Sequence, residues 1–289
     1  MTDRDPSDQD TALDPDKVAA MVADAAIPSV LLVKTDTDIL DGAPGCWLGG
    51  APTLPPEIDW PWLPNRGEPS HPLHFIAQIN LAALPPELFD GLLPDAGTLF
   101  FFANYVSDVD VAGGSAVILV EEDVSHHPPR QQPAFPDSFD DSYPMGWWAG
   151  NKVTSFRRWP VTFLPFAAVN HNAFQHEEYW RHAIRRVGAQ FEALAKQAEP
   201  ADGRKFRSAE WSGPGRRRGV MNGTHRMGGP STPYNQAGGD EPDTIRLLTV
   251  EDDDDLGFAL QSCSLAFFID ISDLEVGNFD AVWAYVESD

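Results

Sequence analysis

The sequence contains little cysteine and no long apolar run. Two cysteines, Cys46 and Cys263, are too few for a disulfide framework and lack the spacing of a metal site. We expect two buried free thiols in a reducing cytoplasm, with a single bridge between them as the alternative. No apolar run approaches the roughly 18 residues of a membrane span, and the start, MTDRDPSDQD, is acidic, unlike a secretory signal. These absences predict a cytoplasmic protein without a membrane segment.

Positive charge is also scarce. The chain has 20 lysines and arginines against 44 aspartates and glutamates, which gives a formal net charge of −24. Such acidity favours solubility and disfavours binding to nucleic acid or to an anionic membrane surface. The exception is 152–226, where fourteen basic residues accompany six acidic ones. This basic segment binds an anion or, in the interpretation that we favour, meets the protein's own acidic surface.

Hydrophobic patterning predicts an α+β protein with mostly antiparallel sheets. Apolar residues at helical spacing indicate an N-terminal helix from Asp14 to Ala26 and one long middle helix from His176 to about Ala198. Alternating or continuous apolar runs predict seven to nine strands, within 29–34, 71–84, 93–105, 116–123, 161–166, 244–251, 262–271 and 279–288. We expect 1–12 to be a disordered acidic tail and 13–289 to be a single domain.

Two stretches of the sequence resemble each other. GGAPTLP at 49–55 and GGPSTPY at 228–234 are each followed by an alternating strand, a loop and an aromatic strand. This order predicts two similar β-rich halves (a pseudo-duplication), at about 28–124 and 222–289, with an insertion and helix at about 125–221 between them. Such halves would leave a pseudo-twofold cleft where a ligand binds. Chance similarity between short β patterns is the alternative.

Three runs, GGAPTLPPEIDWP, PLHFIAQINLAALP and LPDAGTLFFF, resemble the YwqG-like family, catalogued as a domain of unknown function (number 1963). The match covers roughly 28–105 and 222–286. The second, looser part carries His225, Gly228-Gly229-Pro230, Gln236, Leu247-Leu248, Asp252–Asp255 and Leu265–Ile269. The resemblance implies an α+β fold and a bacterial-type intracellular protein, and it implies no established activity.

Polar residues inside the matched runs are the first candidate site. They are Gln78, Asn80, His225, Asn235 and Gln236. Amides and an imidazole fix a polar ligand by hydrogen bonds, and amides are poor acid–base groups. The pattern therefore favours binding over catalysis. The alternative is that these side chains hold their own Gly-Pro turns in place.

A second candidate is the run GPGRRRG, in which Arg216, Arg217 and Arg218 could clamp a phosphate or an acidic partner. It lacks the order of a phosphate-binding loop, and a mobile loop is the alternative. The run 176–182 fails the H-E-x-x-H zinc pattern, and 251–255 fails the calcium-loop pattern and is expected to be a solvated acidic turn. No G-x-S-x-G motif is present. We predict no catalytic residue, no metal site and no cofactor.

These observations favour a non-enzymatic cytoplasmic binding protein. Its partner would be another protein or a small polar ligand, and its acidity suggests an immunity- or antitoxin-like role toward a basic toxin. The rival hypothesis is a hydrolase or transferase that acts on a phosphorylated or anionic substrate through Arg216–Arg218 and His225. Nucleic-acid binding by 152–226 conflicts with the net charge of the chain.

Overall fold

The computed structural model describes Ala20 and residues 26–35, 43–64, 70–105, 113–136, 155–169, 225–229, 243–253, 256–258 and 263–287. The strands are β1 (Ala26–Lys34), β2 (Trp47–Leu48), β3 (Trp62–Leu63), β4 (His71–Pro72), β5 (His74–Asn80), β6 (Thr98–Ala103), β7 (Ser115–Val120), β8 (Trp159–Val169), β9 (Arg226–Gly228), β10 (Thr244–Glu251), β11 (Ser264–Asp270) and β12 (Trp283–Glu287). Short 3₁₀ helices are η1 (Leu81–Ala83), η2 (Leu88–Gly91) and η4 (Phe279–Ala281), and α3 spans Ile271–Glu275. None of the helices in these ranges is long and apolar enough to cross a membrane.

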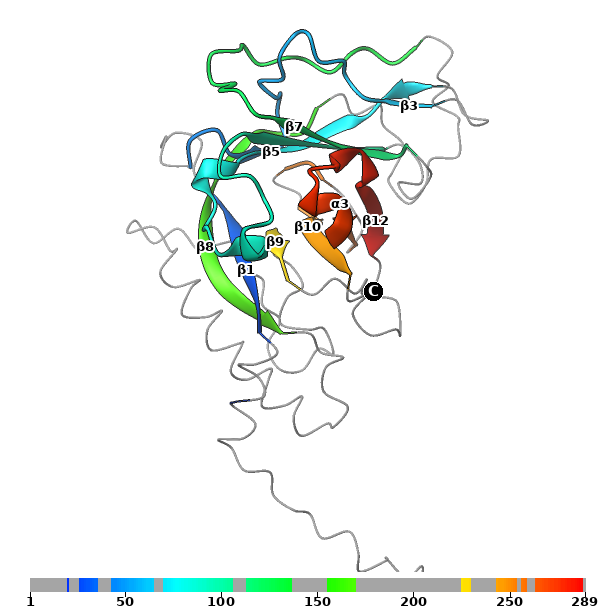
Figure 1. The fold of residues 1–289 in the computed structure, drawn as a ribbon. Coiled ribbons are helices and arrows are strands. Elements are labelled where there is room, and N and C mark those ends of the chain that lie inside the picture. The colour runs from blue at the N-terminus through cyan, green and yellow to red at the C-terminus, as the bar shows by residue number, and fades with distance from the viewer. Residues whose placement is uncertain are drawn as a thin grey trace, which may run out of the picture.

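Ten strands form one antiparallel sheet in the order β12-β11-β10-β9-β1-β8-β2-β5-β6-β7, and β3 pairs with β4 separately. The sheet curls until its edge strands, β7 and β12, lie near each other, so it resembles a nearly closed barrel (Figure 1). Successive side chains of a strand point to opposite faces of a sheet. Every second residue therefore faces the interior of the barrel.

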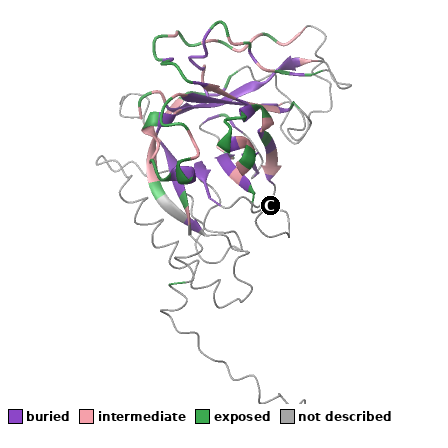
Figure 2. Ribbon diagram, viewed as in Figure 1, coloured by how far each residue is buried: buried purple, intermediate pink, exposed green. Residues whose placement is uncertain are grey.

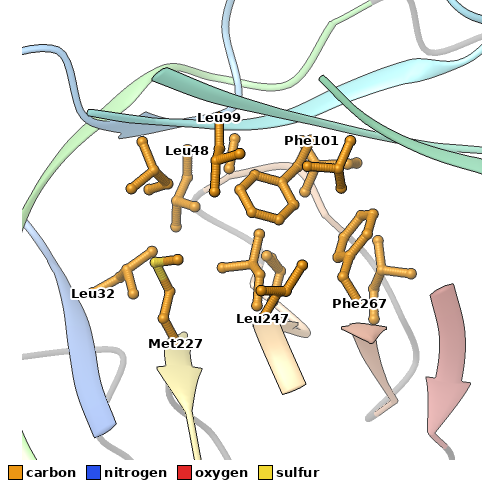
Figure 3. Close-up of a cluster of buried hydrophobic side chains, with 14 of the residues drawn as sticks. Leu32, Leu48, Leu99, Phe101, Met227, Leu247 and Phe267 are labelled. Carbon is orange, nitrogen blue, oxygen red and sulfur yellow. The ribbon is translucent and has the colours of Figure 1, made fainter. Parts of the chain in front are cut away.

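The main hydrophobic core fills this interior. Figure 3 shows Leu48, Leu99 and Phe101 on one side of it, and Met227, Leu247 and Phe267 on the other. The rings of Phe101 on β6 and Phe267 on β11 meet edge to face, with centroids 5.2 Å apart. Because these two strands are not neighbours in the sheet, the contact spans the interior, and the sheet covers its own apolar face.

A second hydrophobic cluster covers the outer face of β5 and β6. Phe75, Phe100 and Phe102 point outward there and pack with Trp60, whose Nε1 donates a hydrogen bond to the Leu73 carbonyl at 2.8 Å. Trp60 belongs to the connection between β2 and β3. Strands β5 and β6 are therefore buried on both faces, while the connections around them stay partly exposed (Figure 2).

The α+β prediction is wrong for the described residues, which are mostly antiparallel β. Helix in these ranges is limited to Ala20, α3 and the three 3₁₀ segments. The physical reason is the closure of the sheet, because strands on opposite sides of the barrel bury each other and no helix is needed to cover the core.

The N-terminal helix expected to end at Ala26 lies outside the described residues apart from Ala20, and Ala26 itself begins β1. The long middle helix expected at 176–198, the tail at 1–12 and most of the insertion also lie outside them.

The expected strands are confirmed in position, since every predicted range overlaps a strand of the structure. Two half-sheets with a cleft between them, however, are not what forms. We define a first unit (β1, β2, β5, β6 and β7) and a second unit (β8 to β12). Strand β1 pairs with β8 and β9, and β8 also pairs with β2, so the strands of both units alternate at the centre of one continuous sheet.

Candidate functional site

The end of the barrel where β1 and β10 finish carries a buried group of charged side chains. The Asp253 carboxylate accepts a hydrogen bond from Lys34 Nζ at 2.5 Å and another from His225 Nε2 at 2.8 Å. The other ring nitrogen of His225, Nδ1, accepts from the backbone N–H of Glu251 at 3.1 Å. This pattern assigns the proton of neutral His225 to Nε2. Both nitrogens of the imidazole are therefore occupied.

Burial and pairing set the charges of this group. Burial lowers the pKa of His225 below its ordinary value, and contact with Asp253 offsets that effect only in part. For Asp253, burial alone would raise the pKa, but the hydrogen bonds from His225 and Lys34 outweigh it and hold the pKa below its usual range. The group is thus a Lys34 cation, an Asp253 anion and a neutral His225. It stabilises the ends of three strands and leaves no free acid or base.

These shifts predict a loss of stability in mild acid. A buried histidine with a lowered pKa stays neutral in the folded chain, whereas the unfolded chain takes up a proton below about pH 6.5. Stability that is present above that pH should fall as the pH drops from 7 to 5, and Asp253 adds a further loss below about pH 4. Urea unfolding at each pH measures the free energy of unfolding. Between pH 7 and 5 this free energy should fall less for His225→Gln than for the wild type. An equal fall in both proteins would contradict the assignment.

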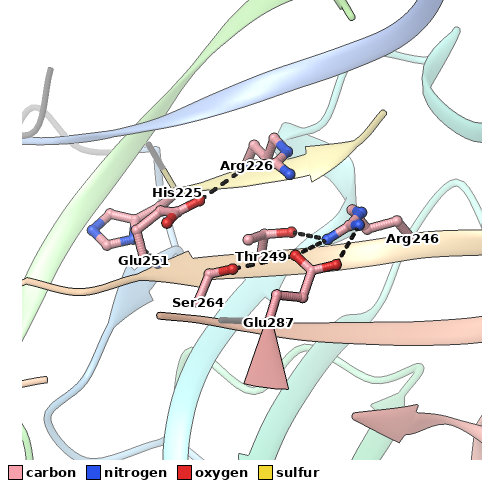
Figure 4. A network of polar contacts seen from close by, with 7 residues as sticks. All are labelled: His225, Arg226, Arg246, Thr249, Glu251, Ser264 and Glu287. Atoms are coloured by element: carbon pink, nitrogen blue, oxygen red, sulfur yellow. Dashed lines mark hydrogen bonds and ion pairs between the residues drawn. The ribbon is translucent and has the colours of Figure 1, made fainter. Parts of the chain in front are cut away.

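A second charged group lies on the outer face of β10, β11 and β12 (Figure 4). Arg246 makes a bidentate contact with Glu287, with N–O distances of 2.7 and 2.9 Å. Arg246 also donates to Thr249 Oγ1, and Ser264 Oγ donates to Glu287. All four residues are buried. Paired and hydrogen-bonded on both sides, this ion pair joins the three strands through side chains.

Arg226 on β9 is a second buried arginine next to this group. Its Nη1 lies 3.3 Å from Glu251 Oε1. Burial lowers the pKa of Arg226, the nearby Arg246 cation lowers it further, and the two glutamates offset both effects in part. Since the backbone of Glu251 also holds His225, the two charged groups are connected through this one residue.

Gln78 and Asn80, two of the predicted binding residues, hold the first Gly-Gly stretch. Gln78 Oε1 accepts from the backbone N–H and the hydroxyl of Thr53, and its Nε2 donates to the Gly45 carbonyl. Asn80 Nδ2 donates to Pro44, and its Oδ1 accepts from the N–H of Ala82 at the start of η1. Both amides make the structural contacts that the alternative interpretation expected. Their role in ligand binding stays a prediction.

The structure does not bring Gln78 and His225 together. Gln78 lies on β5 and His225 directly precedes β9, and strands β1, β8 and β2 lie between them in the sheet. The other predicted residues, Asn235, Gln236, Arg216, Arg217 and Arg218, lie outside the described residues. Within those residues, no group of three or more His, Cys, Asp or Glu side chains is placed to hold a metal ion.

Both cysteines are buried and neither forms a disulfide. Burial raises the pKa of the Cys46 thiol to about 12, and a hydrogen bond from the Asn80 N–H to its sulfur offsets this only in part. The thiolate, which is the reactive form, is therefore rare at neutral pH.

We expect native Cys46 to resist alkylation. At pH 8, iodoacetamide should modify it at least about 100-fold more slowly in the folded protein than in urea, because the thiol is both protonated and covered. Mass spectrometry of peptides after timed labelling measures this ratio. Fast labelling of Cys46 in the native state would show that the site opens or that the thiol is ionised.

A cluster of histidines and aromatic rings lies outside the sites predicted from the sequence. His71 and His74 are fully buried and contact the Phe135 ring, with centroids 5.6 and 5.7 Å away. Tyr105, Phe156 and Phe258 pack against one another beside His74. His71 Nε2 contacts Asn104, and His74 Nδ1 accepts from the Tyr105 N–H. The dense histidine spacing in HPLH was the signal that could have marked this cluster.

Positive and negative side chains differ in their exposure to solvent. Arg226 and Arg246 are buried, and Lys34 is paired with Asp253. Among the described basic residues, only Arg157 and Arg158 are exposed, and they stack on Trp159 and Trp47 with distances of 4.4 and 4.1 Å to the ring centroids. Exposed carboxylates, in contrast, are frequent on the described connections: Glu57, Asp59, Glu87, Asp90, Asp95, Glu121, Glu122, Asp123, Asp243, Asp252, Glu275 and Asp280.

Comparison with known proteins places the chain in a family. No curated protein gives a significant match. The profile of one protein family matches residues 47–287, which begins at the first residue of β2 and ends at the last residue of β12. The chain therefore belongs to the family described as "Domain of unknown function (DUF1963)".

Proposed function

We propose that this chain is a non-enzymatic, cytoplasmic binding protein of the YwqG-like type, and that its acidic surface recognises a basic protein partner. The observation that carries the proposal is the division of charge. Folding buries or pairs Lys34, Arg226 and Arg246 and leaves carboxylates on the exposed connections. A surface of one sign attracts and orients a partner of the opposite sign. A basic toxin, bound in the manner of an immunity protein, is the partner class that fits this surface.

The state of the polar side chains supports binding rather than catalysis. His225 has both nitrogens in hydrogen bonds to Asp253 and Glu251, so it has no free nitrogen to take a proton from a substrate. The amide of Gln78 is bound to backbone and to Thr53 in the same way. These contacts make the described polar residues part of the framework.

The test is affinity capture from the native cell at low and high salt, with two matched variants. In one, Glu121, Glu122 and Asp123 become Gln, Gln and Asn. In the other, Glu87, Asp90 and Asp95 are neutralised likewise, so both variants lose the same charge from exposed positions. The proposal expects a basic partner, release at high salt, and a greater loss of capture in one variant than in the other. The proposal is contradicted if salt does not change the amount of partner captured, if both variants lose capture equally, or if no partner is found.

The rival function, action on a phosphorylated or anionic substrate, is favoured by one observation. Arg157 and Arg158 are exposed, and no carboxylate pairs with either of them among the described residues. Phosphate and pyrophosphate should then raise the melting temperature of the wild type. The increase should disappear when Arg157 and Arg158, or Arg216 to Arg218, are replaced by alanine. The absence of any shift in the wild type removes this rival.

A further inference from the structure

The two units of the sheet, β1–β2–β5–β6–β7 and β8 to β12, have the same strand order. In each unit the last four strands are neighbours in chain order, and the first strand is separated from them by the first strand of the other unit. From one edge, the second unit runs β12-β11-β10-β9 and then meets β1. From the other edge, the first unit runs β7-β6-β5-β2 and then meets β8. Each unit therefore extends the sheet of the other.

The correspondence holds at the level of single residues. Trp47 pairs with Gln78, and Arg226 pairs with Thr249. The β5–β6 pairing shifts register between Phe75 and Ala77, and the β10–β11 pairing shifts between Arg246 and Leu248, so Gln78 and Thr249 each follow a bulge at the same spacing. This alignment makes Phe101 equivalent to Phe267, the two rings that touch across the core.

The contacts between the units also repeat. The Val161 N–H donates to the Cys46 carbonyl at 3.2 Å, and the Leu32 N–H donates to the His225 carbonyl at 2.9 Å. Cys46 and His225 directly precede equivalent strands, β2 and β9, and each receives its hydrogen bond from the first strand of the opposite unit. A Gly-Gly pair follows each contact, and both pairs have positive φ angles.

Those glycines leave room for the exchanged strand. A Cβ on Gly49 would overlap the carbonyl oxygen of Arg157, which leads into β8. A Cβ on Gly228 would lie 2.7 Å from the carbonyl oxygen of Pro28 in β1. In both units, then, a glycine at the end of the second strand lies directly against the first strand of the other unit or against the residues that lead into it.

We propose that the barrel consists of two units that have exchanged their first strands, so that each is completed only by the other and the covalent connection between them is not what holds them together. Strand β1 has no partner within its own unit in the described sheet, and neither has β8. A unit without its counterpart would expose the edge of β2 or β9 and one side of the core. The units are therefore expected to fold jointly rather than one at a time.

The test cuts the full-length chain between the units. A specific protease site placed within 137–154 allows the folded protein to be cleaved after purification. The two fragments are expected to stay together in size-exclusion chromatography at the mass of the intact chain, to unfold in one transition, and to re-form the complex after separation in urea. Separation in native buffer, or cooperative unfolding of either isolated fragment, would overturn the proposal.

Two glycine variants make the test specific. In the cleaved protein, Gly228→Ala should weaken association of the fragments by about 100-fold or more, because the added methyl group displaces β1. Gly257→Ala is the matched control, since Gly257 also has a positive φ but no atom of the described residues lies within 4 Å of its Cβ position. Equal association of the two variants would show that the exchanged strands do not hold the fragments together.

Discussion

Replacing Gly49 by alanine is expected to lower the free energy of unfolding by roughly 2–5 kcal/mol. Two effects add. The φ angle of Gly49 is +60°, a conformation that costs a residue with a Cβ about 1–2 kcal/mol. The added methyl group would also overlap the backbone oxygen of Arg157, and such overpacking costs about 1–3 kcal/mol. Urea denaturation followed by tryptophan fluorescence measures the change.

The chain offers a control that separates these effects. Gly257 has a φ of +77°, and none of the residues that the structure describes comes within 4 Å of its Cβ position, so Gly257→Ala should cost only about 1–2 kcal/mol. The difference between the two variants is then the cost of pushing β2 away from the strand beside it. If Gly49→Ala and Gly257→Ala lose the same stability, the close approach of Arg157 to Gly49 has no energetic weight.

Glu287→Gln is expected to cost about 3–5 kcal/mol. The change keeps the shape of the side chain but leaves the Arg246 guanidinium buried without its carboxylate, and an uncompensated buried charge is strongly destabilising. The loss should appear as a lower urea midpoint, with little change in the dependence of the free energy of unfolding on urea concentration.

The matched variant removes both charges at once. Arg246→Met combined with Glu287→Met replaces the pair by apolar side chains, and replacing a buried ion pair in this way is often close to neutral. We expect the double variant to be more stable than Glu287→Gln alone. If the double variant is much less stable to unfolding than Glu287→Gln, the ion pair contributes net stability through its contacts with Thr249 and Ser264.

The positions of the strands could be predicted from the sequence because each has its own local pattern. TIRLLTVE at 244–251 alternates, and its predicted range is that of β10. The same local patterns misled at the level of fold class. Two helical patterns suggested an α+β protein, but nothing local reveals that ten strands close on themselves and cover their own core.

Pairing between distant strands was the part that the sequence could not provide. β1 reads as a short strand after a predicted helix, and no pattern in it points to β8 or β9. The bulges at Ile76 and Leu247, which align the two units, become visible only once the register is known. The sequence similarity around Gly49 and Gly228 indicated two related halves, yet it gave no sign that they share one sheet through exchanged strands.

The charged groups were missed for a related reason. Arg246 occupies the polar position of an alternating strand, which normally indicates exposure to solvent. Asp253 belongs to an acidic run that reads as a solvated turn, yet it contacts Lys34 and His225. In both cases the partner is far away in the sequence, so the burial of the charge depends on tertiary structure alone. His225 was singled out for a ligand, and its contacts instead connect strand ends.

The pairing of β1 also determines when the protein can fold on the ribosome. Its partners β8 and β9 begin more than a hundred residues further along the chain, and β9 follows Lys34 after about 190 residues, which takes on the order of 10–40 s of synthesis. Until β8 has been synthesised, the apolar strand VLLV, at 30–33, has no partner to pair with. Folding must therefore wait until nearly the whole chain has emerged, and the unpaired strand of the nascent chain is exposed to aggregation until then.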